Sequence, residues 1–327
     1  EVNSITYSPN GQQLASASVD NTIKIWDVSS GKLFRTLSDH SAEVISVAYS
    51  PNGHQLASAS VDNTIKIWDV ISGKLLKTLT GDSDRVISVA YSPNGQQLAS
   101  ASFDKTIKIW DVSSGKLLKS LTGHSDRVIS VAYSPNGQQL ASASFDKTIK
   151  IWDVSSGKLL KSLTGHSSGV MSVAYSPNEQ QLASASFDNT IKIWDVSSGK
   201  LLKTLTGHSD RVISVAYSPN GQQLASASND KTIILWDLDF DNLLLSGCNL
   251  LNNYFIAHPE VLEELQLCQT RSRLAQGATT LVIQGEKLAR NNDINGAVEK
   301  FGKAQQWDNK LKFDSQARAK ELANKAK

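Results

Sequence analysis

The sequence has little cysteine and no long apolar run. Its 327 residues contain two cysteines, Cys248 and Cys268, both in the last quarter of the chain. A disulfide framework is therefore excluded for the first three quarters, which is typical of a protein from a reducing compartment and predicts a cytoplasmic location. No apolar run approaches the ~20 residues that a membrane-spanning helix needs, so we expect no membrane association.

A strong net charge is also missing. Lys and Arg number 33 and Asp and Glu number 31, which gives a formal net charge of +2. This balance does not favour nucleic acid or an anionic membrane surface as a partner. The first four residues, Glu1-Val2-Asn3-Ser4, lack the basic and apolar stretches of a signal peptide and do not include Met. We therefore interpret the chain as a fragment or a processed product.

Motifs of common enzyme classes are absent too. The sequence has no G-x-x-x-x-G-K-[ST] phosphate loop, no G-x-G-x-x-G dinucleotide loop, no H-E-x-x-H zinc motif and no paired C-x-x-C. Each of these motifs supplies backbone donors or ligands that its chemistry requires. We therefore predict a non-catalytic protein without cofactor or metal.

The sequence is rich in internal repetition. Six Trp-Asp pairs follow one another at a constant spacing of 42 residues, beginning with Trp26-Asp27 and ending with Trp236-Asp237. Each unit predicts four short strands; in the second unit these cover residues 44–49, 55–60, 64–70 and 74–80, with turn residues such as Pro51-Asn52-Gly53 between them. A lone four-stranded meander cannot bury both faces, so the copies are expected to stack around an axis as a β-propeller.

The repeat strongly resembles the WD-repeat (WD40) family. Three Gly-His pairs, at residues 123–124, 165–166 and 207–208, each precede a Trp-Asp pair by the same interval, and six matching units cover residues 1–238. The resemblance implies a mainly β fold, a propeller with six recognisable blades of four antiparallel strands, in a family whose propellers usually have seven. It also implies binding of proteins or peptides rather than catalysis.

The units also share a His, a Ser, an Asp and a Trp at fixed spacing, and these residue types invite two interpretations. A Ser-His-Asp set could form a hydrolase triad. The resemblance instead gives these residues a structural hydrogen-bonding role, and an active site is not normally copied in every repeat. We therefore favour a structural tetrad, expected to be complete in four units: His40/Ser58/Asp62/Trp68, His124/Ser142/Asp146/Trp152, His166/Ser184/Asp188/Trp194 and His208/Ser226/Asp230/Trp236.

The third unit departs from this pattern. It has Gly81-Asp82 in place of Gly-His, which would bring the carboxylates of Asp82 and Asp104 near each other. Such a pair could raise one pKa or recruit a cation. A metal site normally needs three or more ligands, so we favour sequence drift with a solvated Asp82.

Positions that differ between near-identical copies indicate where specificity lies. Three positions per unit fall in the loops that share one face of a propeller, and by resemblance this face around the central channel contacts ligands. The candidate partner-binding residues at these positions are Arg85, Arg127, Arg211, Ile87, Ile129, Met171, Ile213, Phe103, Phe145 and Phe187. Phe and Arg side by side are typical of interface hot spots, although the Phe rings could instead pack against neighbouring blades. Glu1 and Glu43 lie opposite the arginines, which predicts a polarised face.

After residue 238 the apolar spacing becomes helical. Leu244, Cys248, Leu251 and Phe255 follow at intervals of three and four, and Pro259 begins another short helix. We expect residues 239–270 to dock on the last blade and residues 271–327 to form a helical hairpin, which weakly resembles one tetratricopeptide unit. The two cysteines are expected to be helix-face residues without metal partners.

These observations favour a binding scaffold for a protein or peptide, with an undefined oligomeric state. The alternative is a ligand-sensing regulatory module of a larger bacterial signalling protein, whose nucleotide-binding or kinase domain would lie upstream. That alternative comes from the resemblance of such nearly identical arrays to the sensor portions of those proteins.

Overall fold

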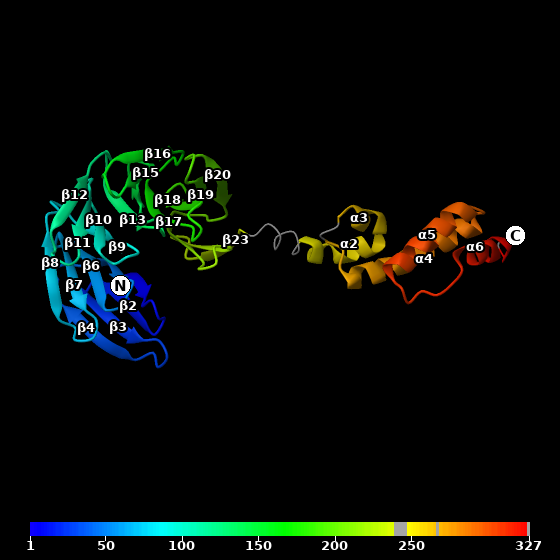
Figure 1. The fold of residues 1–327 in the computed structure, drawn as a ribbon, viewed down its shortest axis with the longest axis horizontal. Coiled ribbons are helices and arrows are strands. Elements are labelled where there is room, and N and C mark those ends of the chain that lie inside the picture. Colours follow the sequence, from blue (N-terminus) through cyan, green and yellow to red (C-terminus); the bar gives the residue numbers. More distant parts are fainter. Residues whose placement is uncertain (239–246, 266–267, 326–327) are drawn as a thin grey trace. The chain divides into compact units, whose positions relative to one another are not determined.

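The computed structural model describes residues 1–238, 247–265 and 268–325. The chain divides into two compact units, Glu1–Trp236 and Asp237–Lys327, each of which is described here separately. The first unit is a six-bladed β-propeller, and the second is a small helical region (Figure 1).

The strands of the propeller follow the 42-residue repeat. Blades 1 to 3 comprise β1 (Val2–Tyr7), β2 (Gln13–Ser18), β3 (Thr22–Asp27), β4 (Leu33–Ser38); β5 (Val44–Tyr49), β6 (Gln55–Ser60), β7 (Thr64–Asp69), β8 (Leu75–Thr80); and β9 (Val86–Tyr91), β10 (Gln97–Ser102), β11 (Ile107–Asp111), β12 (Leu117–Leu121). Blades 4 to 6 comprise β13 (Val128–Tyr133), β14 (Gln139–Ser144), β15 (Thr148–Asp153), β16 (Leu159–Thr164); β17 (Val170–Tyr175), β18 (Gln181–Ser186), β19 (Thr190–Asp195), β20 (Leu201–Thr206); and β21 (Val212–Tyr217), β22 (Gln223–Ser228), β23 (Ile233–Asp237).

Every blade is an antiparallel meander whose turns use the residues that such turns need. Between the first two strands of blade 2, Gly53 takes a φ of 74°, and its N–H donates to Ser50 O at 2.8 Å. Between the second and third strands, Asn63 takes the left-handed conformation that Asn tolerates better than most residues. The fold class predicted from the sequence is confirmed, and the strand bounds expected in blade 2 agree within one residue.

The hydrophobic core lies between blades rather than within them. At the junction of blades 1 and 2, small and aliphatic residues of one blade pack against Val, Tyr, Leu and Trp of the next: Ala15, Ala17, Ile23, Ile25 and Leu37 against Val44, Val47, Tyr49, Leu56, Trp68 and Val70. Equivalent residues form the next three junctions. The first strands of successive blades are neighbours, so they form the inner wall of the arc (Figure 1). Each blade therefore depends on its neighbours for burial.

The second unit is helical. Its helices are α2 (Asn252–Ala257), α3 (Pro259–Glu264), α4 (Arg271–Arg290), α5 (Ile294–Trp307) and α6 (Ser315–Lys325). The main packing is between α4 and α5, where the Phe301 ring occupies the space that a Cβ on Gly285 would need. None of the described helices has both the length and the hydropathy that crossing a bilayer requires.

The two cysteines differ from the sequence expectation. Cys248 and Cys268 form a disulfide that ties the segment before α2 to the segment before α4. They are buried in one small cluster with Phe255 and Leu262, and this shared burial brings the two thiols together. From the sequence we expected helix-face cysteines without metal partners and did not foresee that they bond to each other. Leu244 lies outside the described residues.

Candidate functional site

The candidate site is the propeller face formed by the loops that enter the first strand and leave the second strand of each blade. A backbone hydrogen bond joins these two loops in blades 3 and 4: Phe103 N–H donates to Arg85 O, and Phe145 N–H donates to Arg127 O, both at 3.0 Å. The same bond recurs in the other blades. The variable Arg and Phe positions of one blade are therefore direct neighbours.

Aromatic and cationic side chains also meet across the blade boundaries. The guanidinium of Arg127 lies 4.7 Å from the ring centroid of Phe103 in the preceding blade, and Arg85 lies 6.0 Å from the same ring. Arg211 stacks in the same way on Phe187, at 4.7 Å. Such cation–π contacts hold both partners in a fixed orientation. The three arginines remain exposed while the Phe rings are half-buried.

Blade 5 has glycine where its neighbours have arginine. Gly169 leaves room for the ring of Phe145, which occupies the place that a Cβ on residue 169 would take. Phe145 in turn packs against Phe187, with ring centroids 5.6 Å apart. The Phe rings therefore pack across blade boundaries and still keep part of their surface exposed. Partner binding by these residues stays a prediction.

The aliphatic candidates occupy a β-bulge at the start of the inner strands. The register shifts around Ile87, Ile129, Met171 and Ile213, because one extra residue is inserted there against the second strand. A bulge re-aims the side chain that it carries. Ile129 is buried, Ile87 and Met171 are half-buried, and Ile213 is exposed in the last blade. The structure therefore places these residues next to the Arg positions, with unequal access to solvent.

The tetrad expected from the sequence is present in four blades. In blade 5, His166 Nδ1 lies 2.8 Å from Asp188 Oδ2, His166 Nε2 lies 2.8 Å from Ser184 Oγ, and Trp194 Nε1 donates to Ser184 at 2.8 Å. The same bonds occur in blades 2, 4 and 6. Ser184 has no exposed surface, so a substrate cannot reach its hydroxyl. The arrangement links buried polar groups rather than exposing a nucleophile.

Burial also sets the charge state of this network. It lowers the pKa of His166 below the usual value, although the bond to Asp188 opposes the shift. Burial acts to raise the pKa of Asp188, but hydrogen bonds from Thr190 and His166 lower it on balance. The lowered pKa of His166 and the lowered pKa of Asp188 both agree with a neutral imidazole that donates from Nδ1 to an ionised carboxylate.

Blade 3 corrects the expectation of a solvated Asp82. Its carboxylate is buried, and Lys108 Nζ donates to Asp82 Oδ1 at 2.7 Å and to Asp104 Oδ2 at 2.8 Å. Burial raises the pKa of Asp82, whereas hydrogen bonds from Lys108 and Thr106 overcome burial and lower the pKa of Asp104 to about 2. The lysine ammonium supplies the positive charge that two neighbouring carboxylates need.

Lys108 was missed because every blade except the last has lysine at this position. The one distinguishing signal in blade 3 was Asp82, a carboxylate where four other units have His. Across the part of the chain that the structure describes, no three His, Cys, Asp or Glu side chains come together as metal ligands would.

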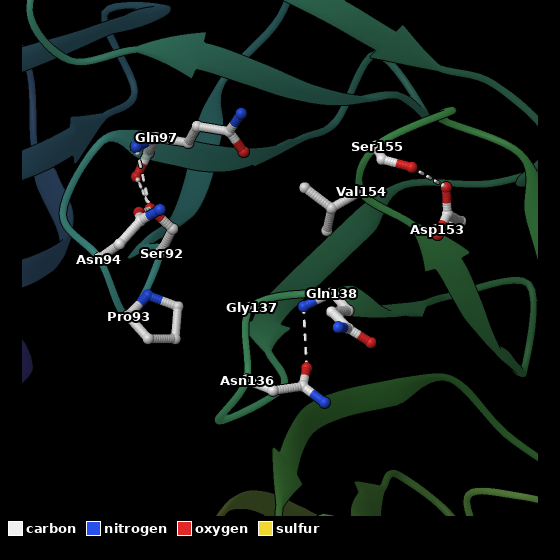
Figure 2. Close-up of a pocket in the computed structure, with 10 residues that line it drawn as sticks. All are labelled: Ser92, Pro93, Asn94, Gln97, Asn136, Gly137, Gln138, Asp153, Val154 and Ser155. Carbon is white, nitrogen blue, oxygen red and sulfur yellow. Dashed lines mark hydrogen bonds between the residues drawn. The ribbon is translucent and has the colours of Figure 1, made fainter.

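The opposite face carries shallow polar grooves between blades. Figure 2 shows the groove between blades 3 and 4, lined by the turn after β9, the turn after β13 and the turn after β15. Its polar groups largely satisfy one another: Asn136 Oδ1 accepts from the Gln138 backbone N–H at 2.9 Å, and Ser155 Oγ donates to Asp153 Oδ1 at 2.8 Å. An equivalent groove lies between blades 2 and 3, so the feature follows from the repeat.

Comparison with known proteins agrees with this geometry. The family model described as "WD domain, G-beta repeat" matches residues 1–27, 31–69, 73–111, 115–153, 157–195 and 199–237. Periodic tryptophan protein 2 of Arabidopsis thaliana is 46% identical over 44 residues, which cover 14% of this chain and 5% of that protein. The chain therefore matches only a short stretch of that relative. Propellers of this kind generally bind protein partners and are generally not catalytic. With six matched repeats and six blades, the chain belongs to the WD40-repeat family.

Proposed function

We propose that the protein is a non-catalytic scaffold that binds a protein or peptide on the propeller face carrying the Phe and Arg side chains. The observation that carries the proposal is the stacking of Arg127 on Phe103 and of Arg211 on Phe187. These contacts hold four side chains in place before a partner arrives. Pre-ordered aromatic and guanidinium groups lose little conformational entropy on binding, which suits them to an interface.

The chemistry of the face favours a partner segment that carries carboxylates beside an apolar side chain. An exposed guanidinium can bind a carboxylate through two parallel hydrogen bonds, while the half-exposed Phe145 and Phe187 rings offer apolar surface next to it. In the first two blades, Glu1 and Glu43 stand at the position that arginine holds in blades 3, 4 and 6, so one side of the face is negative and the other positive. A bound segment with charges of both signs would therefore have a preferred direction across the face.

The proposal is tested with two matched double variants of the full chain. Phe103→Ala with Arg127→Ala removes one stacked pair from the proposed face. Asn94→Ala with Asn136→Ala alters the opposite face by the same number of residues. After partners are captured with the wild-type protein and identified, their affinities for both variants are measured by calorimetry.

We expect the Phe103/Arg127 variant to lose more than ~2 kcal/mol of binding free energy, as truncated hot spots do, while the Asn94/Asn136 variant binds normally. Thermal unfolding of both variants must stay close to that of the wild type. Normal binding by the Phe103/Arg127 variant would contradict the proposal. An equally large loss of melting temperature would show that the pair mainly holds the blades together.

The role as a sensor module of a bacterial signalling protein and the cytoplasmic location remain predictions from the sequence. The Cys248–Cys268 disulfide bears on location, because reducing compartments keep such thiols reduced. Trapping the thiols with an alkylating reagent at the moment of cell lysis would test the predicted location. Alkylated cysteines would support a cytoplasmic location, and an intact disulfide would contradict it.

A further inference from the structure

The residue that turns the chain between the second and third strands is not the same in every blade. In blades 1, 2 and 5 it is asparagine, and in blades 3, 4 and 6 it is Lys105, Lys147 and Lys231. All six residues adopt the left-handed conformation, with φ between 66° and 70°. Asparagine adopts this conformation more readily than lysine, so each of the three lysines carries a conformational cost.

The turn itself gives no reason for lysine. The backbone N–H of Lys105 donates to Ser102 O at 3.2 Å, and that of Asn63 donates to Ser60 O at 3.3 Å, so the turn closes in the same way with either residue. All three lysines are exposed, and within the described part of the chain none of them forms an ion pair. A strained residue that folding does not require is typical of a functional surface.

The lysines also follow the arginines of the candidate site from blade to blade. The residue before the first strand is arginine in blades 3, 4 and 6, and it is glutamate or glycine in blades 1, 2 and 5. Of the six blades, those with this arginine are therefore the ones with lysine. Phenylalanine does not follow the same rule, because blade 5 has Phe187 without either cation and blade 6 has both cations with Asn229 in the Phe position. The two cations thus vary together, although the residue between them in the sequence does not.

Both cations of a blade lie on the Phe and Arg face. Lys105 comes two residues after Phe103, whose N–H donates to Arg85 O, so the two loops that carry the cations are joined directly. The neighbouring carboxylate of Asp84 is engaged, because it accepts from the Arg85 backbone N–H at 2.7 Å. Blades 4 and 6 repeat this bond. Each of these three blades therefore presents two exposed cations beside one engaged carboxylate.

We propose, on the basis of the function proposed above, that Lys105, Lys147 and Lys231 select the partner, an acidic peptide segment that places a carboxylate at each of blades 3, 4 and 6. In each blade the arginine binds the carboxylate in a fixed orientation, and the lysine adds a second positive charge from the adjoining loop. Glu1 and Glu43 on the same face repel a uniformly charged polymer such as nucleic acid. A peptide that is acidic over part of its length therefore fits this face better.

The strain and the charge of the lysines predict opposite effects on stability and on binding. The turn variant replaces Lys105, Lys147 and Lys231 with asparagine, the residue that the other three blades have there. It should raise the melting temperature by about 2–4 °C, because a conformational cost is removed three times. It should also bind an acidic peptide about 10-fold more weakly, because three exposed charge pairs are lost. Lysines kept for folding would not show this opposition.

The experiment selects peptides from a displayed random library on the wild-type full chain. The probes are the enriched peptides and copies of them in which every Asp and Glu is replaced by Asn and Gln. Their affinities for the wild type and the turn variant are measured by calorimetry. The matched control variant replaces Lys116, Lys158 and Lys200 with asparagine, because these exposed lysines lie before the outer strands on the opposite face and carry the same total charge.

The enriched peptides should be rich in Asp and Glu, and their amide copies should bind more weakly by about 10-fold or more. The control variant should bind like the wild type, and its melting temperature should not rise. Peptides without an excess of acidic residues would overturn the proposal, as would acidic peptides that bind the turn variant normally. Equal weakening in the control variant would assign the effect to net charge and would overturn it too. A lower melting temperature of the turn variant would show that the lysines serve the fold.

A third variant, Phe103→Ala with Arg127→Ala, separates this inference from the proposed function. If no peptide is enriched, or if the enriched peptides bind this variant normally, the proposed function fails and the inference fails with it. If this variant loses binding while the turn variant does not, the face binds peptides but the lysines do not select them, and the inference alone fails. A single-stranded oligonucleotide that binds more tightly than the peptides, and not to the turn variant, would overturn the inference in favour of nucleic acid.

Discussion

Lys108 Nζ lies 2.7 Å from Asp82 Oδ1 and 2.8 Å from Asp104 Oδ2, whose equivalents bond to a histidine in four of the other blades. Blade 3 thereby has a buried ion pair where the other tetrads have a neutral imidazole bonded to a carboxylate, while Trp110 keeps its bond to Ser100. Blade 3 thus folds like the others with a different charge state at its tetrad.

We expect Lys108→Met to destabilise the propeller by about 3 kcal/mol, because it leaves two buried carboxylates without a cation. Lys150→Met is the matched control: Lys150 occupies the same strand position in blade 4 but donates to Ser162 and pairs with no carboxylate. Urea denaturation of both variants measures the difference. Equal losses would show that the two carboxylates add nothing to what a lysine contributes at this strand position.

The tetrad gives a second stability prediction. His166→Ala should lower the free energy of unfolding by ~1–3 kcal/mol, since it strands Ser184 and Asp188 without their partner. His54→Ala changes an exposed histidine and should have little effect. Full stability of His166→Ala, together with loss of labelling by a fluorophosphonate probe that marks the wild-type protein, would instead support a hydrolase.

The buried histidines also predict how stability depends on pH. Burial lowers the pKa of His40, His124 and His166 below 6.5 in the folded chain. In the unfolded chain they titrate near 6.5, so below that pH the unfolded state binds more protons. Their contribution to stability is complete above pH 6.5 and is lost as the pH falls. Urea denaturation at several values between pH 8 and pH 5 should show this decline. Replacing all three histidines by Gln should make the free energy of unfolding less dependent on pH. An unchanged pH dependence would contradict its assignment to these histidines.

Most of the fold could be predicted because a strict repeat presents each strand, turn and tetrad several times. The site was harder to predict where equivalent side chains of different blades make different contacts. The sequence spacing could not show that Arg127 stacks on the Phe103 ring of the preceding blade, since that contact crosses a blade boundary. Nor could it show that Lys108 turns inward, because the same lysine faces different partners in other blades. The disulfide was missed for a similar reason: pairing depends on how α2 and α4 pack.

Reduction of the Cys248–Cys268 disulfide should destabilise the helical unit by about 3 kcal/mol, the loop-closure value for a separation of 20 residues. The propeller contains no cysteine, so its unfolding should not change. Thermal unfolding followed by circular dichroism, with and without dithiothreitol, measures both units. Cys248→Ser with Cys268→Ser should reproduce the reduced state. A shift in the propeller transition as well would mean that the two units unfold together.

The last prediction concerns blade 6, which has three strands in the part of the chain that the structure describes, whereas the other blades have four. The sequence predicts that the segment 239–256 covers the outer side of β23, and residues 239–246 of it lie outside the described residues. One argument for this prediction is that Ile234 stands where the other five units have lysine. In the structure Ile234 is half-buried, and its Cδ1 lies 3.6 Å from the place of a Cβ on Gly207, so its own blade already explains this substitution. The proposed covering residues Leu243, Leu244 and Leu245 lie outside the described residues.

The remaining argument is the strand edge, because an uncovered edge offers backbone donors and acceptors to other chains. Deleting residues 239–327 should therefore make the propeller aggregate or melt at a lower temperature. In hydrogen exchange, β23 should lose protection before β7, its equivalent in blade 2. If solubility and β23 protection are unchanged by the truncation, the helical unit is an independent module, because an edge that it covered would have been exposed.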